Sequence, residues 1–254
     1  MVNNTMKRFQ QKVVIVTGGS SGIGLAAAKL FAEEGAHVYI TGRRQAELDA
    51  AAAAIGPNVS AVQADASRLA DLQQLYQRAR TEHGRVDVVF ANAGMVVSGA
   101  IGELSEEHYD KQFDVNVKGV LFTVQEALPL MGPGSTVVLN ASIAASVGYP
   151  SSSLYSASKA AVRSFARSWT ADLKDRGIRV NAISPGPTET QVFEASGYTA
   201  EQAEAAKQHL ASSIPLGRMA RAEEVARVVL FLASEDSSFM AGSEVTVDGG
   251  LTQV

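Results

Sequence analysis

The chain contains no cysteine, so it can form neither disulfides nor thiolate metal sites. Its four histidines are scattered and show no ligand spacing such as H-E-x-x-H, so we expect no metal site; they are His37, His83, His108 and His209. Charge of one sign is also scarce, because 22 basic residues face 26 acidic ones and give a net charge of −4. That balance provides no basic surface for DNA or RNA. The composition therefore argues against metal-dependent and nucleic-acid-binding functions.

Long apolar runs are missing as well. No stretch reaches the length needed to span a membrane, and the opening MVNNTMKRFQQK lacks the apolar segment of a signal peptide. We therefore expect a cytoplasmic protein without a membrane partner. Of the 254 residues, 46% are hydrophobic and 19% charged, which suits one soluble domain with a substantial core. No repeat or linker divides the chain, so this domain is expected to cover residues 1–254.

Short apolar runs alternate with longer helical patterns along the chain. The runs indicate strands at 12–18, 36–42, 59–65, 86–94, 135–142, 178–186 and 243–250. Helical patterns lie at 23–34, in an alanine-rich stretch ending at 54, and at 68–82, 105–130, 154–175 and 222–233. Continuous apolar strands separated by helices favour a parallel sheet covered on both faces. Because such crossovers are right-handed, we predict a single doubly wound, Rossmann-type α/β domain with a seven-stranded parallel sheet.

The least regular region, residues 187–221, begins after the carboxyl end of a predicted strand. Its pattern predicts short helices. A long insertion at this place typically covers a ligand crevice, so we expect a substrate lid. The alternative is an excursion without function.

A glycine-rich stretch, TGGSSGIG at residues 17–24, joins the first predicted strand to the first helix. Gly18 can take a tight turn, while Gly22 and Gly24 let backbone and helix approach closely. The helix N-terminus then offers free N–H groups and a positive dipole end to a pyrophosphate. The stretch therefore predicts a dinucleotide site, with a ligand-free glycine turn as the alternative.

The three residues between Gly18 and Gly22 depart from G-x-G-x-x-G and match T-G-x-x-x-G-x-G, the pattern of short-chain dehydrogenases/reductases. The sequence resembles that family over nearly its whole length. The resemblance implies a nicotinamide dinucleotide whose phosphates and ribose lie on Gly18, Ser20, Ser21, Gly22, Ile23 and Gly24. It also implies that Asp65 contacts the adenine, and that Asn92, Ala93 and Gly94 lie along the cofactor and steady the sheet.

The choice of cofactor is expected to depend on the end of the second strand. The sequence there reads YITGRR, with Gly42, Arg43 and Arg44 where an acidic residue would bind a ribose 2′-hydroxyl. A guanidinium pairs well with a phosphate, whereas positive charge at a helix N-terminus is unfavourable without one. We therefore predict NADP(H) over NAD(H). The alternative is that both arginines merely begin a solvated helix.

Tyr155 and Lys159 stand four residues apart in SLYSASKAAV and so share a helix face. A neighbouring ammonium favours the phenolate, so we expect the pKa of Tyr155 to lie below its ordinary value of about 10. Tyr155 could then donate a proton to a carbonyl oxygen, or remove one in the reverse oxidation. The family resemblance also implies that Tyr155 and Lys159 contact the cofactor, with Lys159 on the nicotinamide ribose.

The resemblance implies two further catalytic residues. Ser142 lies thirteen residues before Tyr155 and is expected to bond the substrate oxygen, in preference to Ser146 or Ser151–Ser153. Asn116 resembles the asparagine that anchors a water relay to the lysine. We therefore expect a catalytic set of Asn116, Ser142, Tyr155 and Lys159.

The segment SPGPTET after a later strand matches the P-G-x-x-x-T pattern of the family. The resemblance implies that Pro185 and Gly186 support the nicotinamide. Thr190 is expected to bond its carboxamide, with Thr188 as the less favoured candidate.

The expected substrate pocket is mostly apolar and has no arginine placed for a carboxylate. Its predicted residues are Ser142, Ala144, Val147, Tyr149, Tyr155, Val192 and Phe193. This wall favours a hydrophobic or bulky ketone or secondary alcohol, and hence an NADP-dependent carbonyl reductase or alcohol dehydrogenase.

Two other functions stay open. A 3-oxoacyl-[acyl-carrier-protein] reductase needs a basic surface for its acidic carrier, whereas the lid carries Glu189, Glu194, Glu201 and Glu204 against Lys207. A non-catalytic NADP(H)-binding regulator could share the fold, although the complete set of four catalytic candidates argues against it. The resemblance also implies a homotetramer, with a dimer as the alternative.

Overall fold

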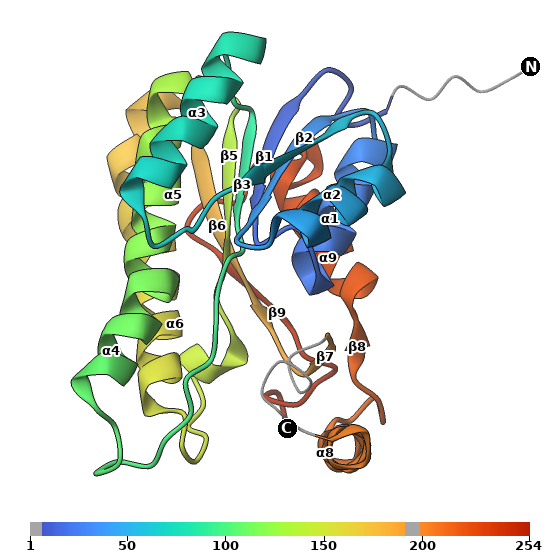
Figure 1. Cartoon of the computed structure of the whole chain (residues 1–254), viewed down its shortest axis with the longest axis vertical. Coiled ribbons are helices and arrows are strands. Elements are labelled where there is room, and N and C mark those ends of the chain that lie inside the picture. The colour runs from blue at the N-terminus through green and yellow to red at the C-terminus, as the bar shows by residue number, and fades with distance from the viewer. Residues whose placement is uncertain (1–6, 191–198) are drawn as a thin grey trace, which may run out of the picture.

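Seven parallel strands form one sheet at the centre of the molecule, with helices on both faces (Figure 1). The computed structural model describes residues 7–190 and 199–254. The strand order is β3-β2-β1-β4-β5-β6-β9. The strands are β1 Val13–Thr17, β2 His37–Gly42, β3 Val59–Gln63, β4 Val88–Ala91, β5 Thr136–Asn140, β6 Arg179–Pro185 and β9 Glu244–Val247. The predicted doubly wound, Rossmann-type α/β fold is confirmed.

Two helical layers enclose the sheet. One layer contains α1 Gly22–Glu33, α2 Gln45–Ile55 and α9 Ala222–Ala233, and the other contains α3 Leu69–His83, α5 Gly119–Ala127 and α6 Ser153–Leu173. Strand β1 shows why the strands read as continuous apolar runs. Its residues Val13 and Ile15 pack in one core, and Val14 and Val16 pack in the other. Successive side chains of the strand point alternately to the two helical layers. Both faces of the strand are therefore buried and must be apolar.

The predicted helix at 105–130 consists of four consecutive helical segments. Helix α4 spans Glu106–Phe113, and α5 follows after a π-helical turn at Asp114–Lys118; a 3₁₀ turn at Leu128–Leu130 is the last segment. A π-turn inserts a wider loop of backbone into a helix and often occurs at functional sites. This turn contains Asn116, so the irregularity sets the direction of a candidate catalytic side chain.

Within residues 187–190 and 199–221, which the structure describes, the region predicted as a lid contains one helix of 14 residues, longer than the short helices expected. Helix α8 spans Ala200–Ser213 and begins at Thr199, whose hydroxyl accepts a hydrogen bond from Gln202 N. Two-residue strands flank it, β7 Thr188–Glu189 and β8 Ala220–Arg221, and pair in parallel. In Figure 1, α8 lies beyond the carboxyl edge of the sheet, close to the C-terminus. None of the described helices is both long and apolar enough to cross a membrane.

Candidate active site

Three of the predicted catalytic side chains surround one cavity at the carboxyl edge of the sheet. Ser142 follows β5, and Tyr155 and Lys159 lie one turn apart near the start of α6. The side chains of Ser142 and Tyr155 are hydrogen-bonded, and Lys159 Nζ lies 5.7 Å from the centre of the Tyr155 ring. All three line a cavity of about 360 Å³. The competing Ser146 is exposed and does not line this cavity.

Lys159 is a buried cation. Its side chain is only 5% exposed, and Nζ donates a hydrogen bond to Asn140 O at 2.7 Å. Burial lowers the pKa of Lys159 from its ordinary 10.5 to about 8. The ammonium therefore persists at neutral pH in a place where its desolvation is unfavourable.

The direction of the Tyr155 pKa corrects the expectation from the sequence. Burial raises the pKa of Tyr155, and the hydrogen bond with Ser142 only partly opposes that effect. The expectation that Lys159 makes this phenol acidic is therefore wrong for the protein alone. Sequence spacing showed that the two side chains share a helix face, but it could not show how deeply that face is buried. At neutral pH the phenol is protonated and ready to donate.

Asn116 is almost completely buried and is held by the segment after β4. Its Oδ1 accepts a hydrogen bond from Met95 N at 2.9 Å, and its Nδ2 donates to Met95 O at 3.0 Å and to Ser158 Oγ at 3.1 Å. A Cβ atom added to Gly94 would lie 3.5 Å from both Asn116 Oδ1 and Lys159 Nζ. The polar ends of Asn116 and Lys159 thus both lie beside Gly94.

The glycine turn has little room for side chains. Gly18 and Gly22 adopt positive φ angles of 64° and 52°, which favour glycine. A Cβ atom on Gly24 would lie 2.2 Å from Gly18 O and 2.5 Å from Asn92 Nδ2. Helix α1 begins here without a capping bond from the Ser21 side chain and without an acidic residue in its first turn. Its N-terminal N–H groups and dipole are therefore available to an anion.

The segment Asn92–Gly94 ties neighbouring strand ends together. Asn92 Nδ2 donates to Thr17 O and Gly18 O, and Asn92 Oδ1 accepts from Asn140 Nδ2. The backbone N–H groups of Asn92 and Ala93 both donate to Thr17 Oγ1 at 3.0 Å. One asparagine therefore joins the ends of β1, β4 and β5 beneath the glycine turn.

The two arginines after β2 differ in their surroundings. Both are exposed, but Arg44 forms an ion pair with Glu47 one turn later in α2. Arg43 has no ion pair within residues 7–190 and 199–254, and its charge acts on Asp65 instead. Burial opposes ionisation of Asp65, but hydrogen bonds from Ser67 and nearby arginine charges outweigh it, so the pKa of Asp65 is lowered. Arg43 is thus the arginine available to a phosphate.

The chain after β6 returns to the glycine turn. A Cβ atom on Gly22 would lie 3.0 Å from Thr190 Cγ2, and one on Gly186 would lie 2.7 Å from Asp248 Cβ. Thr188 Oγ1 donates to Gly186 O at 3.0 Å. Thr190 therefore lies beside the predicted phosphate turn, while the hydroxyl of Thr188 is occupied within its own loop. The structure places both threonines and Pro185 on the wall of the smaller cavity.

The cavity wall includes some of the predicted substrate residues and adds others. Ala144 and Tyr149 line it together with Ser142 and Tyr155, whereas Val147 does not. Val192 and Phe193 lie outside the described residues. The sequence analysis missed several apolar residues of the wall, among them Val96, Leu210 and Leu251. They come from the segment after β4, from α8 and from the C-terminal segment, and only the fold brings them together.

A larger cavity of about 1240 Å³ adjoins the glycine turn on its other side, between α1, α2 and α8. It includes the predicted cofactor residues Ser20, Ser21 and Gly22, but none of the four catalytic candidates. We therefore place the chemistry in the smaller cavity. Thr190 lines both cavities, so they meet beside the glycine turn.

The residues at this edge fit a nicotinamide dinucleotide. The glycine turn leaves space at a helix N-terminus, and Lys159 provides a buried donor. Asn140 Oδ1 is buried, lies in a residue that lines the smaller cavity, and has no hydrogen-bond partner among the described residues. A buried acceptor without a partner is unfavourable unless a ligand donor reaches it.

Comparison with known proteins agrees with this geometry. The family model described as enoyl-(acyl carrier protein) reductase matches residues 18–252. Oxidoreductase asL5 of Sarocladium schorii is 48% identical over 254 residues, covering 99% of this chain and 100% of that protein. The 3-oxoacyl-[acyl-carrier-protein] reductase FabG of Thermotoga maritima is 35% identical, covering 96% of this chain and 99% of its own.

The solved structures agree as well. A structure from Brucella melitensis, described as a short-chain dehydrogenase/reductase and glucose/ribitol dehydrogenase, matches with a TM-score of 0.91 and 30% identity. The match covers 98% of this chain and 100% of that one. The chain is therefore an oxidoreductase and belongs to the short-chain dehydrogenase/reductase family, whose members use nicotinamide cofactors on small molecules.

Proposed function

We propose that this oxidoreductase transfers hydride between NADP(H) and a hydrophobic ketone or secondary alcohol. The observation that carries the proposal is the meeting of the Ser142 hydroxyl, the Tyr155 phenol and the Lys159 ammonium around one apolar-walled cavity. No arginine lines this cavity among the described residues, so nothing there favours a carboxylate substrate.

The four residues divide the work. Ser142 and Tyr155 bind the carbonyl oxygen of the substrate, and Tyr155 donates its proton to that oxygen as negative charge develops there. A reduced nicotinamide, when bound, supplies the hydride to the carbonyl carbon. Lys159 stabilises the phenolate that Tyr155 becomes, and Asn116 holds the backbone segment beside the lysine. Because burial raises the pKa of Tyr155, the resting phenol is in the form needed for reduction.

The preference for NADP(H) rests on Arg43. This exposed guanidinium follows β2, and a Cβ atom on the preceding Gly42 would lie 3.4 Å from Ser20 Oγ in the glycine turn. A 2′-phosphate between Arg43 and Ser20 would be within reach of the guanidinium and the hydroxyl. No carboxylate among the described residues forms an ion pair with Arg43 and competes for it. Arg44, already paired with Glu47, is assigned a smaller part.

We extend the proposal to the lid, the assembly and the location of the protein. The single domain carries a substrate lid at about 187–221, whose helix α8 brings Leu210 to the cavity. The assembly is a homotetramer and its location is cytoplasmic.

Reduction of a carrier-bound 3-oxoacyl group is the second candidate, because the Thermotoga maritima reductase is 35% identical over almost the whole chain. Glu189, Glu201 and Glu204 in the described part of the lid would repel an acidic carrier. Lys207 opposes them, whereas Arg218 and Arg221 form ion pairs with Glu224. A free ketone is therefore the first candidate.

Steady-state rates test the proposal. Purified protein is given NADPH or NADH with ketones of graded size, and a 3-oxoacyl group is supplied both as a small thioester and on its carrier protein; nicotinamide absorbance follows turnover. We expect the highest kcat/KM with NADPH and an apolar ketone. A higher kcat/KM with the carrier-bound group would establish the second candidate. Tight NADPH binding without turnover of any substrate would identify a regulator.

A further inference from the structure

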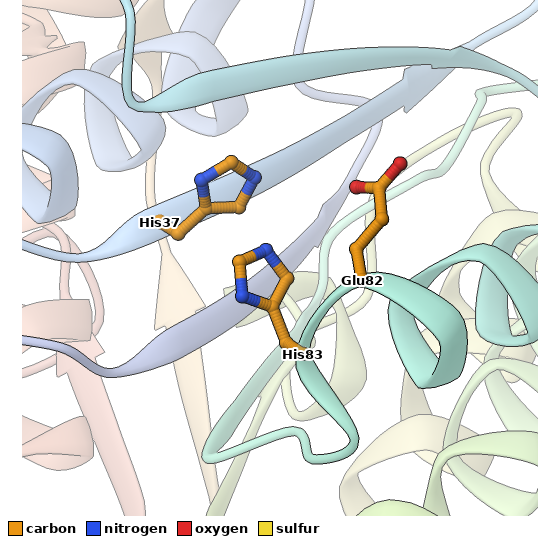
Figure 2. Close-up of side chains that lie close together, drawn as sticks. All are labelled: His37, Glu82 and His83. Carbon is orange, nitrogen blue, oxygen red and sulfur yellow. The ribbon is translucent and has the colours of Figure 1, made fainter.

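Two of the four histidines are not scattered in space. His37 begins β2 and His83 ends α3, and their ring centres lie 4.4 Å apart although 46 positions separate them in the sequence. Glu82 lies beside them, and one ligand atom from each residue lies within 4.8 Å of the others (Figure 2). The cluster lies where β2 begins, so it is at the amino edge of the sheet, opposite the candidate active site.

Neighbouring residues hold the cluster in place. His37 is partly buried, and its Nε2 lies 3.1 Å from Ser60 Oγ on β3, which leaves Nδ1 for another partner. The Glu82 carboxylate accepts hydrogen bonds from the Tyr39 hydroxyl and from Arg78 Nε. Such outer contacts orient a ligand before a metal arrives, and each carboxylate oxygen keeps a second lone pair.

We propose that His37, Glu82 and His83 bind one divalent ion of the zinc class, with water completing the coordination. Two imidazoles and one carboxylate are a ligand set that suits Zn²⁺. Bonds of about 2.0–2.2 Å in a tetrahedral arrangement bring ligand atoms to about 3.4 Å from one another. The three ligand atoms now lie within 4.8 Å of one another, and Glu82 and His83 are exposed side chains that can adjust to this distance.

The electrostatics of the cluster set the strength of the site. A neutral imidazole binds a metal through one ring nitrogen, and the contact with Ser60 leaves Nδ1 of His37 for that purpose. The Arg78 guanidinium, whose Nε lies 2.8 Å from Glu82 Oε1, opposes a second cation. We therefore expect micromolar rather than nanomolar affinity, and removal of Arg78 should strengthen binding.

The site would act as a clamp. It joins the first residue of β2 to the last turn of α3. The strand and the helix already contact each other here through Tyr39 and His83. An ion that binds only the folded chain stabilises it by mass action. Because the catalytic candidates lie at the opposite edge, ion binding should raise the Tm and leave turnover unchanged.

Calorimetric titration of Zn²⁺ into chelator-treated protein without a histidine tag tests the proposal, and the visible absorption of Co²⁺ reports the ligand geometry. We expect one ion per chain, with tetrahedral-type Co²⁺ bands. His83→Ala, which changes an exposed residue, should weaken binding by about tenfold or more, as ligand-shell losses typically do. His209→Ala on α8 is the matched control and should bind as the parent does.

Arg78→Ala distinguishes a site that includes Glu82 from a pair of surface histidines. Binding should tighten by up to about fivefold when the competing cation is removed, since exposed charge pairs contribute up to about 1 kcal/mol. Absence of one-to-one binding, or equal affinity in the parent and His83→Ala, would overturn the proposal. An unchanged affinity in both Arg78→Ala and Glu82→Gln would remove Glu82 from the site and overturn it in the form stated.

Discussion

The two edges of the sheet differ in how their charged and polar groups are paired. At the amino edge, charges are paired close to the surface: Asp87 accepts hydrogen bonds from Val13 N and Lys12 Nζ and forms an ion pair with Arg85. At the carboxyl edge, Lys159 is a buried cation without a carboxylate, and Asn140 Oδ1 has no partner among the described residues. The first arrangement stabilises the fold, whereas the second keeps polar groups ready for a ligand.

This contrast separates stability from activity. In a parallel sheet every loop that follows a strand lies at the carboxyl edge, so the catalytic groups lie there together. The free-energy cost of burying these polar groups therefore also falls at this edge. Changes at the carboxyl edge should therefore alter activity more than stability. Changes at the amino edge should do the reverse.

The largest effect is expected for Tyr155→Phe. The substitution removes the proton donor and keeps the ring, so kcat should fall by about 10²–10⁴-fold, the usual contribution of general acid catalysis. NADPH affinity should change little. Steady-state kinetics and cofactor titration measure both quantities, with Tyr109→Phe, an exposed tyrosine on α4, as the control. A near-normal kcat in Tyr155→Phe would show that another group donates the proton.

Gly24→Ala should damage the dinucleotide site directly. The new Cβ atom would lie 2.2 Å from Gly18 O, so the glycine turn has to shift. We expect a loss of about 1–3 kcal/mol in the free energy of unfolding, as for other overpacked positions, and a cofactor affinity about tenfold weaker or worse. Gly132→Ala is the control, because nothing lies within 4 Å of its Cβ position. Equal behaviour of the two variants would mean that the turn adapts.

Arg43→Ala and Arg44→Ala should differ from each other. Loss of a hydrogen bond to a charged group costs about 1.5–3 kcal/mol, so Arg43→Ala should weaken NADPH by tenfold or more and leave NADH nearly unchanged. Arg44 already pairs with Glu47 in an exposed ion pair, so its removal should cost about 1 kcal/mol or less. Binding titrations with both cofactors decide the matter. Equal losses for NADPH and NADH would show that neither arginine reads the 2′-phosphate.

Asp87→Ala tests the amino edge. It leaves the buried Val13 N without its side-chain acceptor and separates Lys12 and Arg85 from their shared partner. A loss of about 1–3 kcal/mol is expected from the unsatisfied group, with kcat/KM unchanged. Urea unfolding and steady-state rates measure the two effects. A fall in kcat/KM with unaltered stability would contradict the separation of the two edges.

The sequence predicted the fold well because its signal is local. Each buried strand reads as an apolar run, and the boundaries differ from the structure by a few residues. The strand predicted at 86–94 ends at Ala91, because Asn92 leaves the ladder to bond Thr17 and Gly18. A side chain that bonds backbone groups of another strand leaves no periodic trace in the sequence.

What the sequence could not show depends on contacts between distant residues. The π-turn around Asn116 has no pattern that distinguishes it from a continuous helix. Leu210 and Leu251 reach the cavity only through the packing of α8 and the C-terminal segment. The Tyr155 pKa was expected in the wrong direction, because helix spacing gives proximity to Lys159 and says nothing of burial.

Among these variants, Lys159→Met is expected to have the smallest and most specific effect on the free energy of unfolding. A pKa depressed from 10.5 to about 8 corresponds to about 3 kcal/mol of unfavourable burial at neutral pH. Methionine has a similar shape and no charge, but it leaves Asn140 O without the lysine hydrogen bond, which offsets part of the gain. We therefore expect an inactive variant whose cofactor-free form is more stable by about 1 kcal/mol, measured by urea unfolding.

The pH dependence of that difference identifies its cause. Below pH 8 the lysine is protonated in both the folded and the unfolded chain, so the full cost of burying the charge is present. Between pH 8 and 10.5 the unfolded chain binds more protons than the folded one, so the stability of the parent rises with pH. The advantage of Lys159→Met should thus be largest below pH 8 and shrink as the pH approaches 10.5. An advantage that stayed constant over this range would mean that shape, and not charge, limits stability at the carboxyl edge.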